Sequence, residues 1–130
     1  MLEVLAAKRG TPAYHAMYSS WWDGIVVDPS LMVIAVDDHL VHRGDGVFEA
    51  FKFQDGAIYD LWAHLDRLET SAKAIYMELP FAKEVIAERI IEVVKAAKQS
   101  ESTLRLYISR GPGGFDANPY ESVGLSLIHI

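Results

Sequence analysis

The chain has 130 residues, of which 51% are hydrophobic, enough for one domain with a buried core, and its formal net charge is −6 at pH 7. This acidic balance argues against nucleic acid or an anionic membrane as a partner, because both require a basic face on the protein. The chain has no cysteine, no signal-peptide pattern and no membrane-length apolar run, so we expect a cytoplasmic protein without disulfides or thiolate chemistry.

The first part of the chain carries few structural signals. Residues 1–17 match no pattern that assigns them a role. Trp21 and Trp22 are adjacent, so on a strand one would face inward and one outward. An exposed tryptophan here could belong to a subunit interface, and the alternative is burial under a loop. The apolar runs 25–27 and 31–36 flank a turn and predict two short strands.

The polar segment 37–45 contains residue types that bind metal ions. His39 and His42 are three positions apart with aspartates nearby. No helix is indicated here, and no other cluster of histidines and acids completes a site. We therefore expect a tight hydrogen-bonded turn and no metal. The glycines at 44 and 46 permit positive φ angles or a close approach of the backbone.

Residues 47–53 predict a strand rich in aromatic and β-branched side chains. The Asp55-Gly56 pair signals a hairpin turn, and residues 57–59 then form the returning strand. Alternation along the first strand divides its side chains between two faces. One face carries Val47, Phe51 and Phe53, and the other carries Phe48, Ala50 and Lys52.

A helix is predicted after the hairpin, with Asp60 as its N-terminal cap. An apolar stripe lines one face of this helix: Leu61, Leu65, Leu68, Ala72 and Ile75. Arg67 lies off the stripe. Together with the glycine pair at 44 and 46 it makes an anion site or, alternatively, it is an ordinary solvated arginine.

The second half of the chain predicts a further helix and two strands. Pro80 can open the helix, whose apolar residues recur at helical spacing up to Ala97. The strand 103–110 directs Arg105, Tyr107 and Ser109 to one face, and a last strand begins near residue 123. The order of elements predicts an α+β fold with two layers: a mainly antiparallel sheet with two helices packed on one face.

Three ordered blocks carry a resemblance to a known family. They are GDGVFEAF at 44–51, HLDRLETSA at 64–72 and RLYISRGPGGF at 105–115. These blocks resemble the N-terminal half of class IV pyridoxal-phosphate enzymes, which include branched-chain aminotransferases, D-amino-acid aminotransferases and aminodeoxychorismate lyase. The resemblance implies that residues 18–130 form the N-terminal domain of such an enzyme, with the catalytic C-terminal domain absent.

The resemblance also implies chemistry and site residues. The cofactor would be pyridoxal 5'-phosphate, and the substrates would be an amino acid and a 2-oxo acid, with branched-chain amino acids as one option. Arg67 would bind the cofactor phosphate. Phe48, Arg105 and Arg43 would line the substrate side, with His42 at its mouth. Phe48 is equally compatible with a place in the core, and Arg105 with a place on the sheet surface. The complete enzyme would be a homodimer.

A catalytic lysine is expected outside this chain, since none of its lysines lies in the family's lysine motif. Lys52 lies on a strand, and its neighbourhood resembles a strand that does not contact the cofactor in this family. The loop 111–114 lacks the arginine and histidine with which D-amino-acid aminotransferases trap a carboxylate, which disfavours that specificity. The alternatives are a lyase acting on aminodeoxychorismate and a non-catalytic α+β interaction module.

Overall fold

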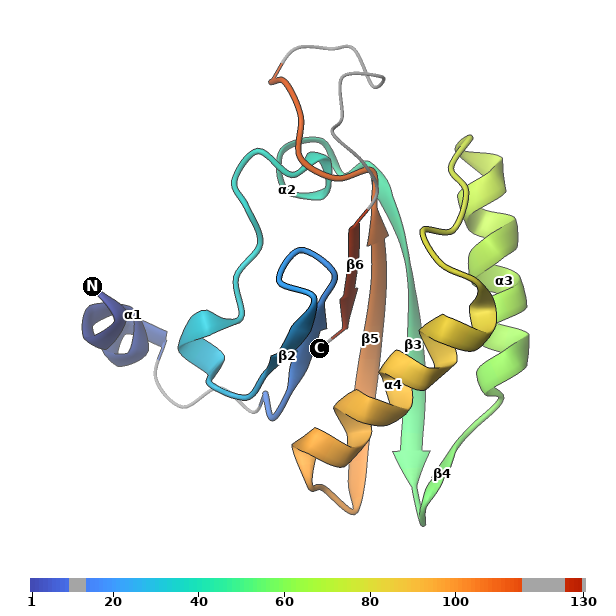
Figure 1. Ribbon diagram of the computed structural model, residues 1–130, viewed down its shortest axis with the longest axis horizontal. Helices are drawn as coiled ribbons and strands as arrows, with labels where there is room; N and C mark the ends of the chain where they lie inside the picture. Colours follow the sequence, from blue (N-terminus) through green and yellow to red (C-terminus); the bar gives the residue numbers. More distant parts are fainter. Residues whose placement is uncertain (10–13, 116–125, 130) are drawn as a thin grey trace.

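The computed structural model describes residues 1–9, 14–115 and 126–129. Within them, one antiparallel sheet runs in the order β2-β1-β6-β5-β3-β4, and helices α3 and α4 cover one of its faces (Figure 1). The predicted two-layer α+β fold is therefore confirmed. The strands are β1 (Met17–Ser19), β2 (Gly24–Val26), β3 (Gly46–Gln54), β4 (Ala57–Ile58), β5 (Glu101–Ser109) and β6 (Ser126–His129). The helices are α1 (Leu2–Arg9), η1 (Pro29–Leu31, a 3-10 helix), α2 (His39–Arg43), α3 (Leu61–Ala74) and α4 (Lys83–Ala97).

The long strands β3 and β5 form the centre of the sheet. They pair over their full lengths, from Gly46 opposite Ser109 to Gln54 opposite Glu101. Their side chains alternate as the sequence predicts: Phe51, Leu104 and Leu106 are buried toward the helices, whereas the residues between them face the uncovered side.

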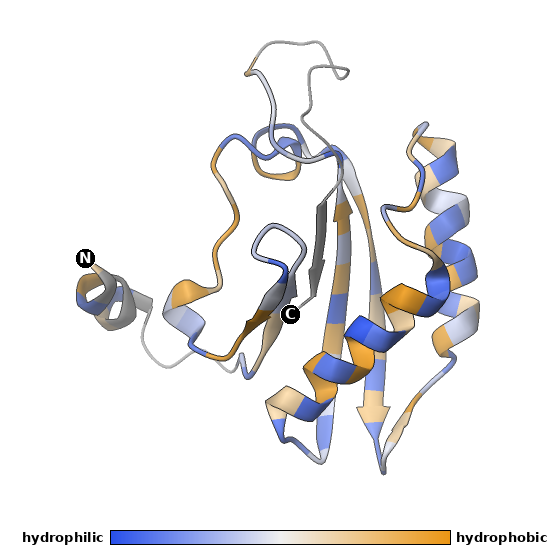
Figure 2. Ribbon diagram, in the orientation of Figure 1, coloured by the Kyte–Doolittle hydropathy of each residue, from blue (hydrophilic) through white to orange (hydrophobic). Residues whose placement is uncertain are grey.

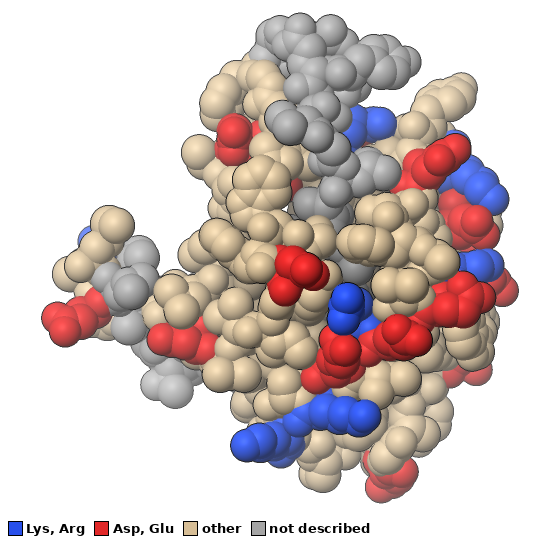
Figure 3. All heavy atoms as spheres, in the orientation of Figure 1, with Lys and Arg blue, Asp and Glu red and all other residues tan. Residues whose placement is uncertain are grey.

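The core lies between this sheet and the two helices. The stripe of α3 contributes the fully buried Leu65, Leu68 and Ala72, and α4 contributes Ile86 and Ile90. The polar residues of α4 lie on its outer side, where Figure 2 shows apolar and polar positions alternating along the helix. Acidic side chains gather there in Figure 3, and Glu84, Glu88 and Glu92 are all exposed.

Three local predictions are wrong. Residues 32–36 form no strand, because the chain instead leaves η1 in an irregular segment. The segment 37–45 contains helix α2, since the Asp38 carboxylate caps it by accepting from the Leu40 N–H at 2.8 Å and Gly44 ends it at φ 65°. Asp60 makes no capping hydrogen bond, because its own φ is 50° and it lies in the left-handed region.

The last strand is not an edge. β6 lies between β1 and β5, pairing His129 with both Tyr18 and Leu106. Trp21 and Trp22 lie in the turn between β1 and β2 rather than on a strand, and both are exposed. Ile25, Val27 and Val33 are exposed as well, so the uncovered apolar surface near the β1–β2 turn is not confined to the tryptophans. In the described part of the chain no helix has the length and apolar character needed to cross a membrane.

Candidate functional site

Glu49 is the one acidic side chain on the helix-covered face of β3, and it is 4% exposed. Buried carboxylates need partners, because an ionised group loses its hydration when it is buried. The partners come from α3, which packs across this part of β3. Arg67 donates from Nε to Oε1 at 2.7 Å and from Nη2 to Oε2 at 2.6 Å. These two parallel bonds form the bidentate geometry in which guanidinium binds a carboxylate best.

His64 completes this group of three side chains. Its Nδ1 lies 2.8 Å from Oε2 of Glu49 and 3.2 Å from Nη2 of Arg67. His64 and Arg67 are three positions apart on α3, so they project from the same side of the helix. The His64 ring also lies against Phe51, with 4.9 Å between the ring centroids.

The electrostatics of the group follow from these contacts. The hydrogen bond from Arg67 lowers the pKa of Glu49, and it outweighs burial, which acts in the opposite direction. The same bond raises the pKa of Arg67. Glu49 is therefore ionised at neutral pH. The Arg67 side chain remains 66% exposed, so the buried carboxylate holds a guanidinium that is open to solvent on its other sides.

A second group of side chains lies on the uncovered face of the sheet. Phe48 is 57% exposed and is paired across the strands with Tyr107, at 5.9 Å between ring centroids. Arg105 follows opposite Ala50 and places its Cζ 5.7 Å from the centre of the Phe48 ring. The result is a surface with an aromatic floor and a cationic side chain over it.

The structure thus brings Phe48 and Arg105 together and places Arg67 on the opposite face of β3. The outer edge of β3 separates the two groups. β4 pairs only with Phe53 and Gln54, so among the described residues no strand pairs with this edge beside Phe48 and Ala50. A ligand that reached both Arg67 and Phe48 would lie along this open edge.

Arg43 is the last residue of α2 and is partly buried, near the point where β3 begins. In the same region the His42 ring lies against Phe115 at 4.8 Å, and its Nε2 is buried without a hydrogen-bond partner. His39 is fully buried in α2, with its Nδ1 3.9 Å from Asp45. The described residues contain no group of three or more side chains suited to hold a metal ion.

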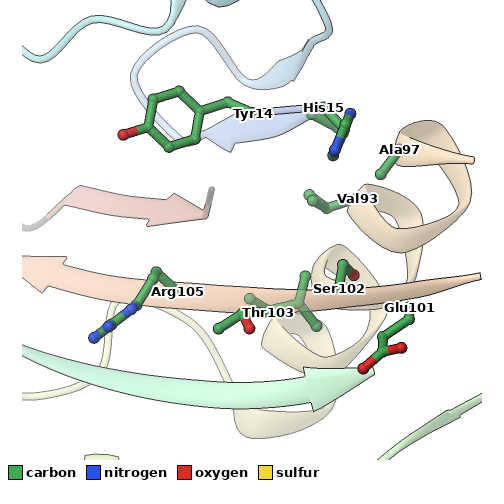
Figure 4. A pocket seen from close by; sticks show the side chains of 10 residues that line it. Tyr14, His15, Val93, Ala97, Glu101, Ser102, Thr103 and Arg105 are labelled. Carbon is green, nitrogen blue, oxygen red and sulfur yellow. The ribbon is translucent and has the colours of Figure 1, made fainter. Parts of the chain in front are cut away.

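A cavity of about 310 Å³ lies beside the start of β5 and the end of α4. Figure 4 shows His15, Val93 and Ala97 on one side of it and Ser102 and Thr103 on the other. Its walls come from residues just beyond those that β6 pairs with on β1 and β5. The cavity therefore lies in line with β6, at a place where no described strand lies between β1 and β5. We assign it no role in binding.

The sequence pattern did not identify Glu49 and His64 as site residues. The signal for Glu49 was a charged residue between Val47 and Phe51 on the apolar face of a strand, where an unpaired charge would be costly. The signal for His64 was its place three residues before Arg67 on the same helix.

Comparison with known proteins identifies the family. The model for "Amino-transferase class IV" matches residues 46–129, which is more than half of the chain. The chain belongs to this family. A relative from Arabidopsis thaliana, "D-amino-acid transaminase, chloroplastic", is 41% identical over 128 residues, which cover 98% of the chain and 34% of the relative. A second, from Mycobacterium tuberculosis, is named "Bifunctional aminodeoxychorismate lyase / D-amino acid transaminase" and is 37% identical over 99 residues, which cover 73% of the chain and 34% of that relative.

Solved structures agree on the fold. The T.th. branched-chain amino acid aminotransferase with pyridoxamine 5'-phosphate superimposes with a TM-score of 0.80 at 25% identity. The match covers 92% of this chain and 40% of that structure. The Escherichia coli branched-chain enzyme gives a TM-score of 0.77 at 20% identity, over 89% of this chain and 38% of that structure. The chain therefore spans well under half the length of the relatives and structures named here. Class IV aminotransferases of this fold use a pyridoxal-phosphate cofactor.

Proposed function

We propose that this chain forms the cofactor-phosphate and substrate-facing side of an enzyme that transfers an amino group between an amino acid and a 2-oxo acid. The observation that carries the proposal is the guanidinium of Arg67, which is fixed by the buried Glu49 and exposed to solvent. A phosphate monoester matches an arginine fork in both charge and geometry. When bound, pyridoxal 5'-phosphate supplies the electron sink that amino-group transfer requires.

The residues present fit such a ligand. Arg67 uses one edge of its guanidinium for Glu49 and keeps further N–H groups for an anion. Among the described residues no strand pairs with the edge of β3 at Phe48 and Ala50, and Phe48 is exposed on the face opposite Arg67.

In this proposal Phe48 packs against the substrate side chain, while Arg105 and Arg43 attract its carboxylate. Phe48 and Arg105 already contact each other on the uncovered face, which supports a shared role. Arg43 lies at the end of α2, near the start of the strand that carries Phe48.

We further propose that the lysine needed for turnover lies outside this chain. Of the lysines here, Lys52 pairs with Glu101 at 3.3 Å on the uncovered face, and Lys83 pairs with Asp66 at 2.6 Å. The isolated chain should therefore show only the background rate with pyridoxal 5'-phosphate, an amino acid and 2-oxoglutarate. Turnover that disappears in Lys52→Ala would overturn this assignment.

The phosphate role of Arg67 is tested by binding. Pyridoxine 5'-phosphate is a suitable probe because it lacks the aldehyde that would react with surface lysines. We expect the chain to bind it in a titration followed by NMR, to bind pyridoxine without the phosphate much more weakly, and to lose the difference in Arg67→Leu. Equal binding of both compounds would refute the proposal.

The substrate class has three candidates within the family: branched-chain amino acids, D-amino acids and aminodeoxychorismate. The relatives named above include transaminases of D-amino acids and a bifunctional aminodeoxychorismate lyase. The loop lacking an arginine and a histidine does not rule out D-amino acids, because the relative with 41% identity carries that name. These options are separated by comparing L-valine, D-alanine and aminodeoxychorismate as substrates. The enzyme tested must contain both this chain and the proposed catalytic lysine.

The proposed assembly is a homodimer in the cytoplasm. The exposed Trp21 and Trp22 of the β1–β2 turn support a subunit contact there. The lack of cysteine is compatible with a reducing compartment, although the relative from Arabidopsis is chloroplastic.

A further inference from the structure

The positions of protons in the Glu49 group follow from its distances. Oε1 of Glu49 receives one hydrogen bond, from Nε of Arg67, and Oε2 has two neighbours, Nη2 of Arg67 at 2.6 Å and Nδ1 of His64 at 2.8 Å. An ionised carboxylate has no proton to donate. The proton between Oε2 and the imidazole must therefore be on Nδ1, and His64 donates to Glu49.

This assignment determines how Arg67 contacts its neighbours. A protonated Nδ1 cannot accept a hydrogen bond, so the 3.2 Å approach of Nη2 to Nδ1 is a contact between two donors. Both donors are held at that distance by Oε2, which accepts from each of them. His64 therefore anchors the carboxylate from the side opposite Nε of Arg67 and restricts its rotation.

The end of the guanidinium stays available. Glu49 accepts the Nε proton and one Nη2 proton, which leaves both Nη1 protons and the second Nη2 proton. These three lie at the outer end of Arg67, and this side chain is 66% exposed whereas Glu49 is 4% exposed. One arginine can thus hold a carboxylate along its side and a second oxyanion at its end.

We propose that His64 is a positioning residue for this anion site: by donating from Nδ1 to Glu49 it fixes the carboxylate that aims the outer end of Arg67 at an incoming phosphate. This role rests on the proposed function, in which Arg67 binds a phosphate monoester. In this role Glu49 and His64 need no contact of their own with the phosphate. They act through Arg67, in the way that outer-shell groups orient the ligands of a bound ion.

The competing account is that Glu49 occupies Arg67 and must be displaced before an anion binds. The two accounts predict opposite effects. If Glu49 positions Arg67, weakening the group lowers the affinity for phosphate. If Glu49 competes, weakening the group raises it.

Two variants of matched shape separate these accounts. His64→Asn and His64→Leu both branch at Cγ, but only asparagine carries an N–H donor near the place of Nδ1. With pyridoxine 5'-phosphate as the probe, we expect His64→Leu to weaken binding about tenfold, as for loss of one hydrogen bond to a charged group. His64→Asn should stay within about threefold of the wild-type affinity. Circular dichroism of both variants confirms that each is folded.

A measurement on the unaltered chain tests the hydrogen bond itself. The nitrogen chemical shifts of the His64 imidazole should report a proton on Nδ1, and the Nε–H signal of Arg67 should exchange slowly with water. In His64→Leu this Arg67 signal should exchange faster, and in His64→Asn it should recover. If His64 had a purely structural role, the exchange rate of the Arg67 Nε–H signal would not depend on whether residue 64 carries an N–H donor.

The outcomes distinguish this inference from the proposed function. A neutral imidazole with its proton on Nε2, equal losses in both variants, or tighter binding by His64→Leu overturns the role of His64 while Arg67 still binds phosphate. Failure of the wild-type chain to bind the phosphorylated probe overturns the proposed function, and with it the site that His64 would serve.

Discussion

Arg110 and Asp45 are 65 positions apart and join the end of β5 to the turn that precedes β3. Nε of Arg110 donates to the Asp45 carboxylate at 2.7 Å, and the Arg110 backbone N–H donates to the Asp45 carbonyl at 3.2 Å. Nη2 of the same side chain donates to the carbonyl of Ile75 at 2.9 Å, just past the end of α3. One arginine therefore ties two strand ends to the end of a helix.

Replacing Arg110 should destabilise the protein. Arg110→Gln removes hydrogen bonds to a carboxylate and a carbonyl in a region where both charged side chains are less than one-fifth exposed. We expect a loss of about 2 kcal/mol in the free energy of unfolding, measured in urea. Lys73→Gln, which breaks the solvent-exposed pair with Glu69, serves as the control and should leave the urea midpoint unchanged. Equal effects of the two substitutions would contradict the role given to Arg110.

Gly46 is required by the close packing of β3 against β5. A Cβ at this position would lie 2.7 Å from the backbone oxygen of Ile108 and 2.9 Å from Cδ1 of Leu40. Since a strand backbone cannot easily shift, Gly46→Ala should cost about 2 kcal/mol in the free energy of unfolding. Gly24→Ala is the matched control, because its nearest atom would be 3.8 Å away. A fully stable Gly46→Ala protein would contradict the close approach of Gly46 to the Ile108 backbone.

The buried Glu49 predicts a specific dependence of stability on pH. Its pKa is lowered in the folded state, chiefly by the hydrogen bond from Arg67, so the ionised form stabilises the fold. This contribution is fully present above the unfolded carboxyl pKa of about 4.3 and is lost as the pH falls through the lower, folded pKa. The difference in unfolding free energy between the wild type and Glu49→Gln should therefore be constant from pH 7 to about pH 5.5 and shrink toward about pH 3.

Urea unfolding of both proteins across this range is the measurement. Glu88→Gln, on the exposed outer side of α4, provides the control and should track the wild type at every pH. A Glu49→Gln difference that grows as the solution becomes more acidic would mean that the carboxylate destabilises the fold.

The exposed tryptophans predict self-association. Trp21 and Trp22 are 56% and 51% exposed, next to an irregular segment in which Val33 and Val36 are also exposed. Because uncovered apolar area favours contact with another chain, we expect the protein to associate at micromolar concentration in light scattering. Changing both tryptophans to serine should weaken association at least about tenfold, since buried tryptophans dominate many interfaces. Tyr76→Ser, at a 92% exposed site far along the chain, is the control. A folded monomer throughout this range would refute the prediction.

The sequence by itself determined the elements whose signals are local. The period of two along 47–53 and 103–110 predicted β3 and β5 and their faces, and the apolar stripe from Leu61 onward predicted α3. These patterns could be recognised in the sequence because the apolar face of a strand or helix is defined by residues only two to four positions apart. The family resemblance in three blocks came from the same stretches.

Only the tertiary structure decided how distant segments meet. β6 enters the sheet between β1 and β5 because strand pairing depends on the approach of remote backbones, which no local pattern encodes. The same holds for the site: Glu49 looks misplaced on an apolar strand face until α3 brings Arg67 and His64 onto it. A buried charge is tolerable only with such partners, and the contacts of 2.6 to 2.8 Å that they make with Glu49 arise from the packing of a helix on a strand.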